Sequence, residues 1–203
     1  MEAIITGDIV NSEQQPDANW LTTLKRYLSS LGESPTVWEV YRGDEFQLKV
    51  PLSDALETAI HIKATMKSTK GLDVRMGIGL GEITFVGSGV SESNGPAYRR
   101  SGRAFESLKE DKSKLTIATG DDLYDDTLNL VLKLALDFMN DWSTVSAEIV
   151  ALALENPEAS QNEIAKRLGI QQSAVSQRQK RARLDLVFDL LTYYSKISKD
   201  LAS

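Results

Sequence analysis

The chain contains no cysteine and only one histidine among its 203 residues. The lack of cysteine excludes disulfides, thiolate zinc sites and a cysteine nucleophile. With His61 as the only imidazole, neither a Ser-His-Asp triad nor a multi-histidine metal site is expected. His61 falls beside the apolar stripe of a helix predicted over residues 53–67, so we expect it to face solvent.

Long hydrophobic runs are also missing. No apolar stretch approaches the roughly 20 residues of a membrane-spanning helix, and the first residues do not show the basic and apolar regions of a secretory signal. We therefore expect a cytoplasmic protein without a membrane partner. The 41% hydrophobic and 26% charged residues are typical of a globular protein.

Positive charge is scarce overall, since the formal net charge is -6, but one segment reverses this balance. Residues 159–183 contain six Lys or Arg residues against Glu163 alone. A short basic block on an acidic chain indicates local contact with a polyanion. A solvated helix face would have the same charge, and the charge alone does not separate the two.

The first 120 residues alternate between strand-like and helix-like hydrophobic patterns. We predict a hairpin around Gly43-Asp44, the order β-α-β-β-α-β and a ferredoxin-like α+β fold with its helices on one face of the sheet. The domain boundary is expected near residues 140–143, which gives one domain over 1–140 and a small all-α domain over 141–203. The predicted strands are 3–10, 36–42, 45–50, 72–80, 82–86 and 115–118, and the predicted helices are 18–31, 53–67, 97–108 and 121–136.

Residues 144–183 have the signals of a helix-turn-helix. A helix over 144–156 precedes a capping box at Ser160 and Glu163, and Gly169 supplies the turn before a polar helix that starts near Gln172. The inward pattern Ile-Ala-x-x-Leu-Gly-Ile resembles that motif, and outward amides and hydroxyls suit base edges in the major groove. An ordinary αα-hairpin is the alternative. The predicted DNA-contacting residues are Gln171, Gln172, Ser173, Ser176, Gln177, Arg178, Lys180 and Arg181.

The chain ends in an amphipathic stripe over residues 184–197. This stripe packs either within the chain or on a second subunit. A homodimer is expected because two half-sites are the usual way in which so small a motif gains specificity.

Two acidic residues stand at the ends of apolar strands near the beginning of the chain. Asp8 ends the first strand, and Asp44 lies in the hairpin. If those strands are neighbours, the two carboxylates meet at one sheet edge, where such a pair can hold a divalent ion over a nucleoside triphosphate. The alternative for Asp44 is a plain hairpin turn, in which Gly-Asp is common.

Four short motifs in the first half of the chain carry a wider resemblance. They are Gly7-Asp8-Ile9-Val10, Arg42-Gly43-Asp44-Glu45-Phe46, Arg75-Met76-Gly77-Ile78-Gly79-Leu80-Gly81 and Gly95-Pro96-Ala97-Tyr98-Arg99-Arg100-Ser101-Gly102-Arg103. With them the chain resembles the SatD family of bacterial proteins, and residues 3–118 resemble class III nucleotide cyclases and, more distantly, diguanylate cyclases. The resemblance implies that Asp8, Asp44 and the carbonyl of Ile9 ligate Mg²⁺ or Mn²⁺.

The same resemblance shows two departures from the cyclase pattern. Arg99 replaces an asparagine that orients the ribose, and Val40 replaces a lysine that reads the base, whereas Arg103 keeps the final arginine. Arg99, Arg100 and Arg103 together form a cluster able to bind phosphate. The resemblance thus implies that the domain binds a nucleoside triphosphate but lacks some of the catalytic residues of a cyclase.

Three functions fit these patterns. The preferred one is a DNA-binding regulator, in which a degenerate cyclase-like domain dimerises the chain and senses a nucleotide or metal. The alternative is an active Mg²⁺- or Mn²⁺-dependent nucleotidyl cyclase or a related phosphoryl-transfer enzyme. A structural dimer module without a ligand is the third.

Overall fold

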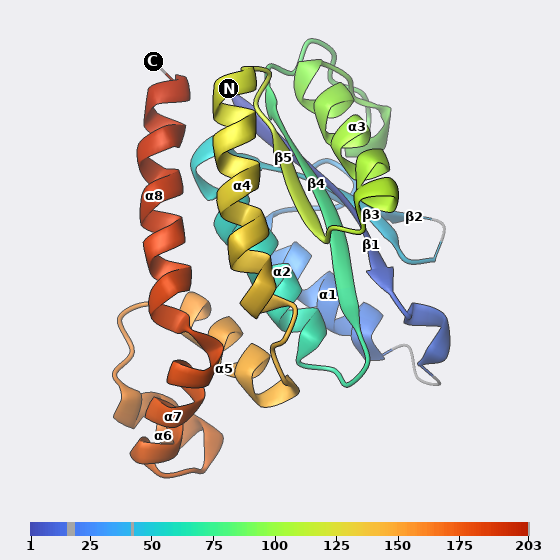
Figure 1. Ribbon diagram of the computed structural model, residues 1–203. Coiled ribbons are helices and arrows are strands. Elements are labelled where there is room, and N and C mark those ends of the chain that lie inside the picture. The colour runs from blue at the N-terminus through green and yellow to red at the C-terminus, as the bar shows by residue number, and fades with distance from the viewer. Residues whose placement is uncertain (16–18, 42, 203) are drawn as a thin grey trace.

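The computed structural model describes residues 1–15, 19–41 and 43–202. These ranges form a mixed α+β structure with one five-stranded sheet and eight α-helices, which confirms the predicted class (Figure 1). The strands are β1 (Glu2–Val10), β2 (Trp38–Tyr41), β3 (Glu45–Pro51), β4 (Asp73–Gly81) and β5 (Leu115–Ala118). The helices are α1 (Asn19–Leu31), α2 (Ala55–Lys67), α3 (Pro96–Asp111), α4 (Asp122–Met139), α5 (Thr144–Glu155), α6 (Gln161–Leu168), α7 (Gln172–Ala182) and α8 (Leu184–Ala202).

The strands lie in the order β2-β3-β1-β4-β5. The first four form an antiparallel sheet, in which Asp8 stands opposite Glu45 on β3 and Arg75 on β4. The last pair, β4 with β5, is parallel. The predicted hairpin is thus present as β2 and β3. Ala18, the expected first residue of the first helix, and Arg42 lie outside the described residues.

The strand predicted over residues 82–86 is wrong. This segment contains only an isolated bridge between Phe85 and Asn94, and Phe85 and Val86 are exposed. Both neighbours of β4 are already in place, because β1 and β5 flank it. The segment after Gly81 therefore cannot pair with β4 as a hairpin partner, and it folds back as a loop before α3.

The expected single helical face holds for α1 and α2, the two helices of the predicted β-α-β-β-α-β order, but not for α3. Leu115 and Ile117 of β5 point into the large core, together with apolar side chains of α1, α2 and α4. On the opposite face α3 packs against β4, where Gly77 and Gly79 let the helix backbone approach (Figure 1). A side chain added at Gly79 would lie 2.2 Å from the carbonyl oxygen of Ala97.

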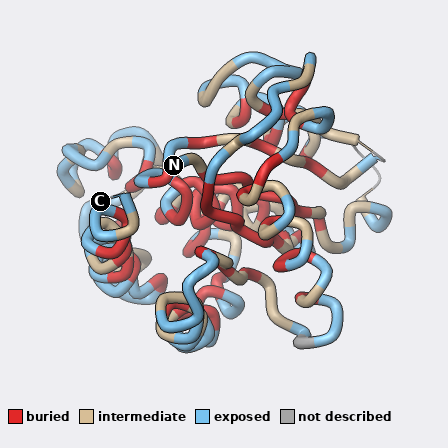
Figure 2. Tube along the Cα trace, turned by 90° about the horizontal axis from the view of Figure 1, so that it is seen from above, coloured by how far each residue is buried: buried red, intermediate tan, exposed pale blue. Residues whose placement is uncertain are grey.

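Helix α2 is buried on two sides, which its sequence did not reveal. The sheet covers one side and α5 covers the other, so the buried residues concentrate in the middle of the molecule (Figure 2). His61, expected to face solvent, is 6% exposed, and Lys63 is fully buried. Tyr27 of α1 and the end of α5 cover the side of α2 that carries His61, so the expectation that this residue faces solvent is wrong.

The apolar core continues from the sheet into the C-terminal helices. Tyr194 of α8 donates a hydrogen bond of 2.7 Å to the carbonyl of Leu52, and Trp142 donates one of 2.9 Å to the carbonyl of Ala182. The turn between α4 and α5 falls at the predicted boundary, while the core runs across it. The division into two domains stays a prediction. Within the described ranges, no helix has both the length and the apolar character to cross a bilayer.

Candidate functional site

The carboxylates of Asp8 and Asp44 lie at the same end of the sheet. Asp8 is near the end of β1, and Asp44 lies in the β2–β3 turn. The turn is held against β1 because the Ile9 amide donates a hydrogen bond of 3.2 Å to the Asp44 carbonyl. Ser12 donates from its hydroxyl to the Asp44 carboxylate at 2.6 Å. The sequence therefore predicted correctly that neighbouring strands bring both acids to one edge.

Sequence reasoning missed the partner of Asp8, which is Arg75. The Nε atom of Arg75 donates to Asp8 Oδ1 at 2.9 Å, and its Nη2 atom donates to Asp8 Oδ2. This forked ion pair is only partly exposed, and it raises the pKa of Arg75, with a further contribution from the charge of Asp44. The antiparallel register between β1 and β4 was the signal that would have identified this pair.

The described residues at this site do not fit a divalent metal as they stand. No group of three or more His, Cys, Asp or Glu side chains suited to a metal ion occurs in the described part of the chain. Arg75 engages both carboxylate oxygens of Asp8, and its positive charge occupies the place where a cation would be attracted. Mg²⁺ or Mn²⁺ bound by Asp8, Ile9 and Asp44 would first have to displace this guanidinium.

The three arginines of α3 do not form one cluster with the acids. Arg100 donates from Nη1 to the carbonyl of Leu80 at 2.6 Å, whereas Asp8 stands opposite Arg75 on the same strand. The five residue steps from Arg75 to Leu80 span roughly 16 Å of extended strand. Within one chain, a triphosphate bound at the acids would not reach Arg100.

The remaining two arginines lie on the exposed side of α3. Arg99 reaches the side-chain oxygen of Asn94 at 3.5 Å, and Arg103 is exposed one helical turn further along. Both guanidinium groups are accessible to an anion from solvent. Arg100, in contrast, lies against Gly81 and Gly120. The predicted phosphate cluster is thus divided between two exposed arginines and one that holds the end of the sheet.

Helices α6 and α7 have the local geometry that the sequence indicates. Ser160 accepts a hydrogen bond from the Glu163 amide, and Glu163 accepts one of 2.8 Å from the Ser160 amide, which is the predicted capping box. Gly169 ends α6 with a φ of 64°, the left-handed region that favours glycine. The Ile170 amide then donates to the Ala165 carbonyl at 3.1 Å, and this bond closes the turn.

The predicted DNA-contacting residues separate into an outer and an inner set. Gln171 is exposed at the N-cap, and the outer set repeats every three or four residues, so it occupies one exposed stripe of the helix. We call this set the α7 stripe. Its members are Ser173, Ser176, Gln177, Lys180 and Arg181.

Arg178 forms the inner set, and the exposed Gln172 joins α7 to α6 through its side chain. Arg178 is half-buried, and its Nη1 atom lies 3.4 Å from the Glu148 carboxylate on α5. Gln172 donates to the Gln161 side chain, whose amide nitrogen donates to Gln179 at 2.7 Å. The prediction that Arg178 lies on the outer face is therefore wrong, because the helix uses this arginine to bind α5.

Comparison with known proteins gives one match. The sequence model of the SatD family matches residues 2–193, which is nearly the whole chain. No curated protein and no solved structure gives a significant match. On the extent of the family match, the chain belongs to the SatD family.

Proposed function

We propose that the protein is a DNA-binding transcription regulator whose N-terminal part is a degenerate nucleotide-cyclase-like domain. The observation that carries the proposal is the α7 stripe. Five exposed polar or basic side chains follow one face of a short helix, which is held from behind by Val175 and by the contact between Arg178 and Glu148. Such a face suits base edges and phosphates in the major groove.

The charge of this region supports contact with nucleic acid. Lys180 and Arg181 are exposed on the stripe, and Lys166 and Arg167 are exposed at the end of the preceding helix. The rest of the chain is acidic, so DNA would be attracted to this region and repelled elsewhere. A helix hairpin that only filled a bundle would not require this concentration of exposed cations.

The strand order of the N-terminal part supports a ferredoxin-like assignment. The sequence of elements from β1 to β4 is β-α-β-β-α-β, and the antiparallel order β2-β3-β1-β4 is the one expected for that fold. The likeness to nucleotide cyclases is proposed from this order together with Asp8 and Asp44 at one edge. A role in sensing a nucleotide and in dimerisation fits better than catalysis.

Catalysis by a single chain is disfavoured by two distances already described. Asp8 is paired with Arg75, and the guanidinium of Arg100 lies roughly 16 Å along the strand from that pair. An active nucleotidyl cyclase, which is the alternative function, would have to release Asp8 from Arg75 and bring an arginine of α3 to the acidic end. Arg99 and Arg103, both exposed, are the residues that a nucleotide could still engage.

DNA binding is tested by fluorescence anisotropy with labelled duplex fragments at several salt concentrations. The double variant Lys180→Ala/Arg181→Ala should weaken binding at least about tenfold and lower the slope of log K against log salt by about 2, because two phosphate contacts are lost. The matched control is Lys25→Ala/Lys196→Ala, which removes two exposed lysines from other helices.

Equal affinity of both double variants and the wild-type protein would show that α7 is not the DNA-reading helix. Arg178 is left unchanged in this design because its loss would also break the contact with α5. Circular dichroism of each variant verifies that the helices remain folded.

A further inference from the structure

A second group of charged residues, remote from the α7 stripe, surrounds a cavity where α2, β4 and α5 meet. The cavity has a volume of about 430 Å³, which is within the range of small-molecule sites. Three lysines line it, together with one carboxylate and the start of α5. These residues, which we call the lysine cavity, are Lys67, Lys70, Lys114, Asp73, Ser143 and Thr144.

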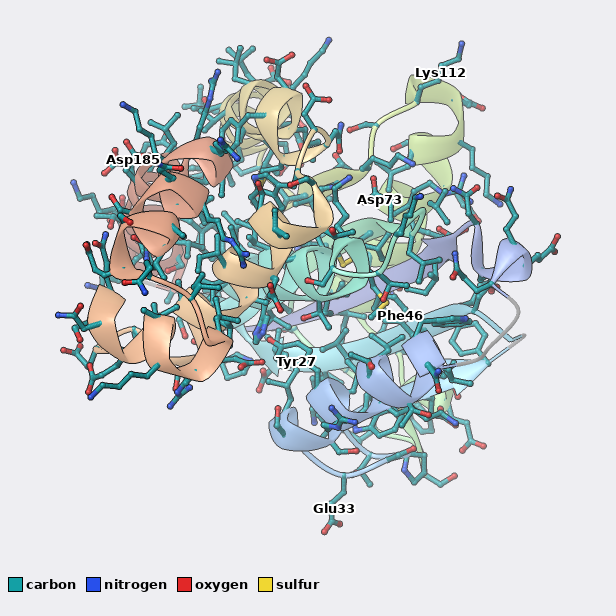
Figure 3. The ribbon with its side chains drawn as sticks, turned by 90° about the horizontal axis from the view of Figure 1, so that it is seen from below. Tyr27, Glu33, Phe46, Asp73, Lys112 and Asp185 are labelled. Carbon is teal, nitrogen blue, oxygen red and sulfur yellow. The ribbon has the colours of Figure 1, made fainter. Side chains whose placement is uncertain are left out.

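The carboxylate of Asp73 lies close to several ammonium groups at the lysine cavity. Asp73 accepts a hydrogen bond of 2.8 Å from the fully buried Lys63, which lies behind the cavity. The ammonium groups of Lys67 and Lys114 lie 3.8 and 4.0 Å from the second oxygen of Asp73. In Figure 3, which views the molecule from below, Asp73 lies among the packed side chains, whereas Lys112 and Glu33 extend at the periphery.

The positive charge of the lysine cavity is not balanced by the described residues. Lys70 is exposed at its rim and has no carboxylate partner in the described part of the chain. Burial lowers the pKa of Lys63 to about 8 although Asp73 opposes the change, and the charges of Lys67 and Lys114 lower it further. Three ammonium groups thus surround the Asp73 carboxylate and Lys70 adds a fourth positive charge at the rim, in a chain that has 29 acidic and 23 basic residues.

The beginning of α5 adds hydrogen-bond donors to the same cavity. Ser143 caps the helix by accepting from the Ser146 amide at 3.3 Å. The amides of Thr144 and Val145 belong to the first turn, where no intrahelical acceptor exists. The positive end of the helix dipole points the same way, so it adds to the attraction of the lysines for an anion.

We propose that the lysine cavity binds the phosphate group of a small molecule. The lysines supply the charge, and the hydroxyl of Thr144 and the first amides of α5 supply directed hydrogen bonds. The proposal does not depend on the function of the α7 stripe or of Asp8.

Isothermal titration calorimetry and thermal unfolding of the full chain test this site with pyrophosphate, inorganic phosphate and ATP, at ionic strength held constant with potassium chloride. Pyrophosphate at about 10 mM should raise Tm by roughly 2–5 °C. The variant Lys70→Ala/Lys114→Ala should weaken its binding about tenfold, because it removes two of the three lining cations. Lys25→Ala/Lys196→Ala is again the matched control.

A second variant, Lys70→Gln/Lys114→Gln, removes both charges but keeps polar side chains only one atom shorter, and it should show the same loss. No binding of any of the three compounds, or equal binding by both cavity variants and the control, would overturn the proposal. A loss confined to duplex DNA, with no binding of small phosphates, would also overturn it, since the lysines would then contact the DNA backbone.

Discussion

At the scale of the residue, His61 shows how burial by neighbouring helices changes the pKa of a side chain. Its imidazole projects from α2 and is buried beside Tyr27 of α1, whose ring centroid lies 4.0 Å away, and Glu155 at the end of α5. The Nε2 atom lies 3.3 Å from a carboxylate oxygen of Glu155, but it is not aligned for a hydrogen bond. Burial lowers the pKa of His61, and the half-exposed Glu155 opposes this only in part.

This lowered pKa predicts a loss of stability in acid. The unfolded chain binds a proton at His61 near pH 6.5, whereas the folded chain does so only at lower pH, so the free energy of unfolding falls as the pH drops below about 6.5. The slope due to one group is at most about 1.4 kcal/mol per pH unit. Urea unfolding of wild type and His61→Gln between about pH 7 and about pH 5.5 measures it.

Because His61 is the only histidine, the difference between the two pH profiles belongs to this residue. We expect the wild-type protein to lose more stability than His61→Gln over that interval. If the wild type instead gained stability relative to the variant on acidification, Glu155 would dominate, and the pKa of His61 would be raised rather than lowered.

At the scale of the element, the contact between α3 and β4 depends on the glycines of the strand. The backbone of α3 lies so close that a Cβ atom at Gly77 would come within 2.3 Å of the Phe105 amide nitrogen. Only residues without a side chain permit this approach. Gly102, in α3 itself, has open space around it.

These two environments predict opposite effects for the same kind of substitution. Gly79→Ala should destabilise the protein by about 1–3 kcal/mol, because the new methyl group meets the backbone of α3. Gly102→Ala should stabilise it by up to about 1 kcal/mol, because alanine loses less entropy in a helix interior. Chemical denaturation measures both values, and the same sign for both variants would contradict the packing described.

The elements that the sequence predicted well are those with local signals. The capping box of α6, the turn at Gly169 and the periodicity of α7 all depend on residues close in sequence, and the structure has them in place. The strand predicted over 82–86, the facing of His61 and the role of Arg178 failed for a common reason. Each of these three features depends on which distant element packs against the residue. A local sequence pattern contains no information about that packing.

The residues of the candidate site also divide into those predicted from local patterns and those that depend on distant neighbours. Asp8 and Asp44 were placed correctly, since the hairpin and the neighbouring strand follow from short-range patterns. The pairing of Asp8 with Arg75 and the distance to Arg100 depend on the register of β1 with β4. The residues of the lysine cavity come from segments that are far apart in the sequence, so no local motif indicated this cavity.

At the scale of the whole molecule, α4 presents an apolar stripe to solvent. Three leucines at spacings of seven and four residues share one side of this helix, and they are 75%, 60% and 68% exposed. A groove beside the stripe contains Leu186 of α8, which is also exposed. Covering this surface by a second copy is a natural route to the proposed homodimer. The stripe consists of Leu123, Leu130 and Leu134.

Charges beside the stripe allow the pairing of two copies to be tested. In an antiparallel arrangement of two α4 helices centred near Leu130, Lys133 of each copy faces Asp126 of the other. Seven residues of helix separate these two positions by about 10 Å within one chain, so the pair cannot form internally. Lys133→Asp should therefore weaken the dimer, and adding Asp126→Lys should restore it, because the charges are then exchanged.

Size-exclusion chromatography with light scattering gives the mass at each concentration, against 22.4 kDa for one chain. We expect the wild type to be dimeric, and Leu130→Asp/Leu134→Asp to be monomeric because it places charge in the middle of the interface. Leu123 lies at the end of the stripe, so Leu123→Asp should have the smaller effect. A dimer that persists in Leu130→Asp/Leu134→Asp would place the interface elsewhere. Restoration of the dimer by the exchanged charges would establish the antiparallel orientation, because a general loss of apolar contact would not be reversed by a second charge substitution.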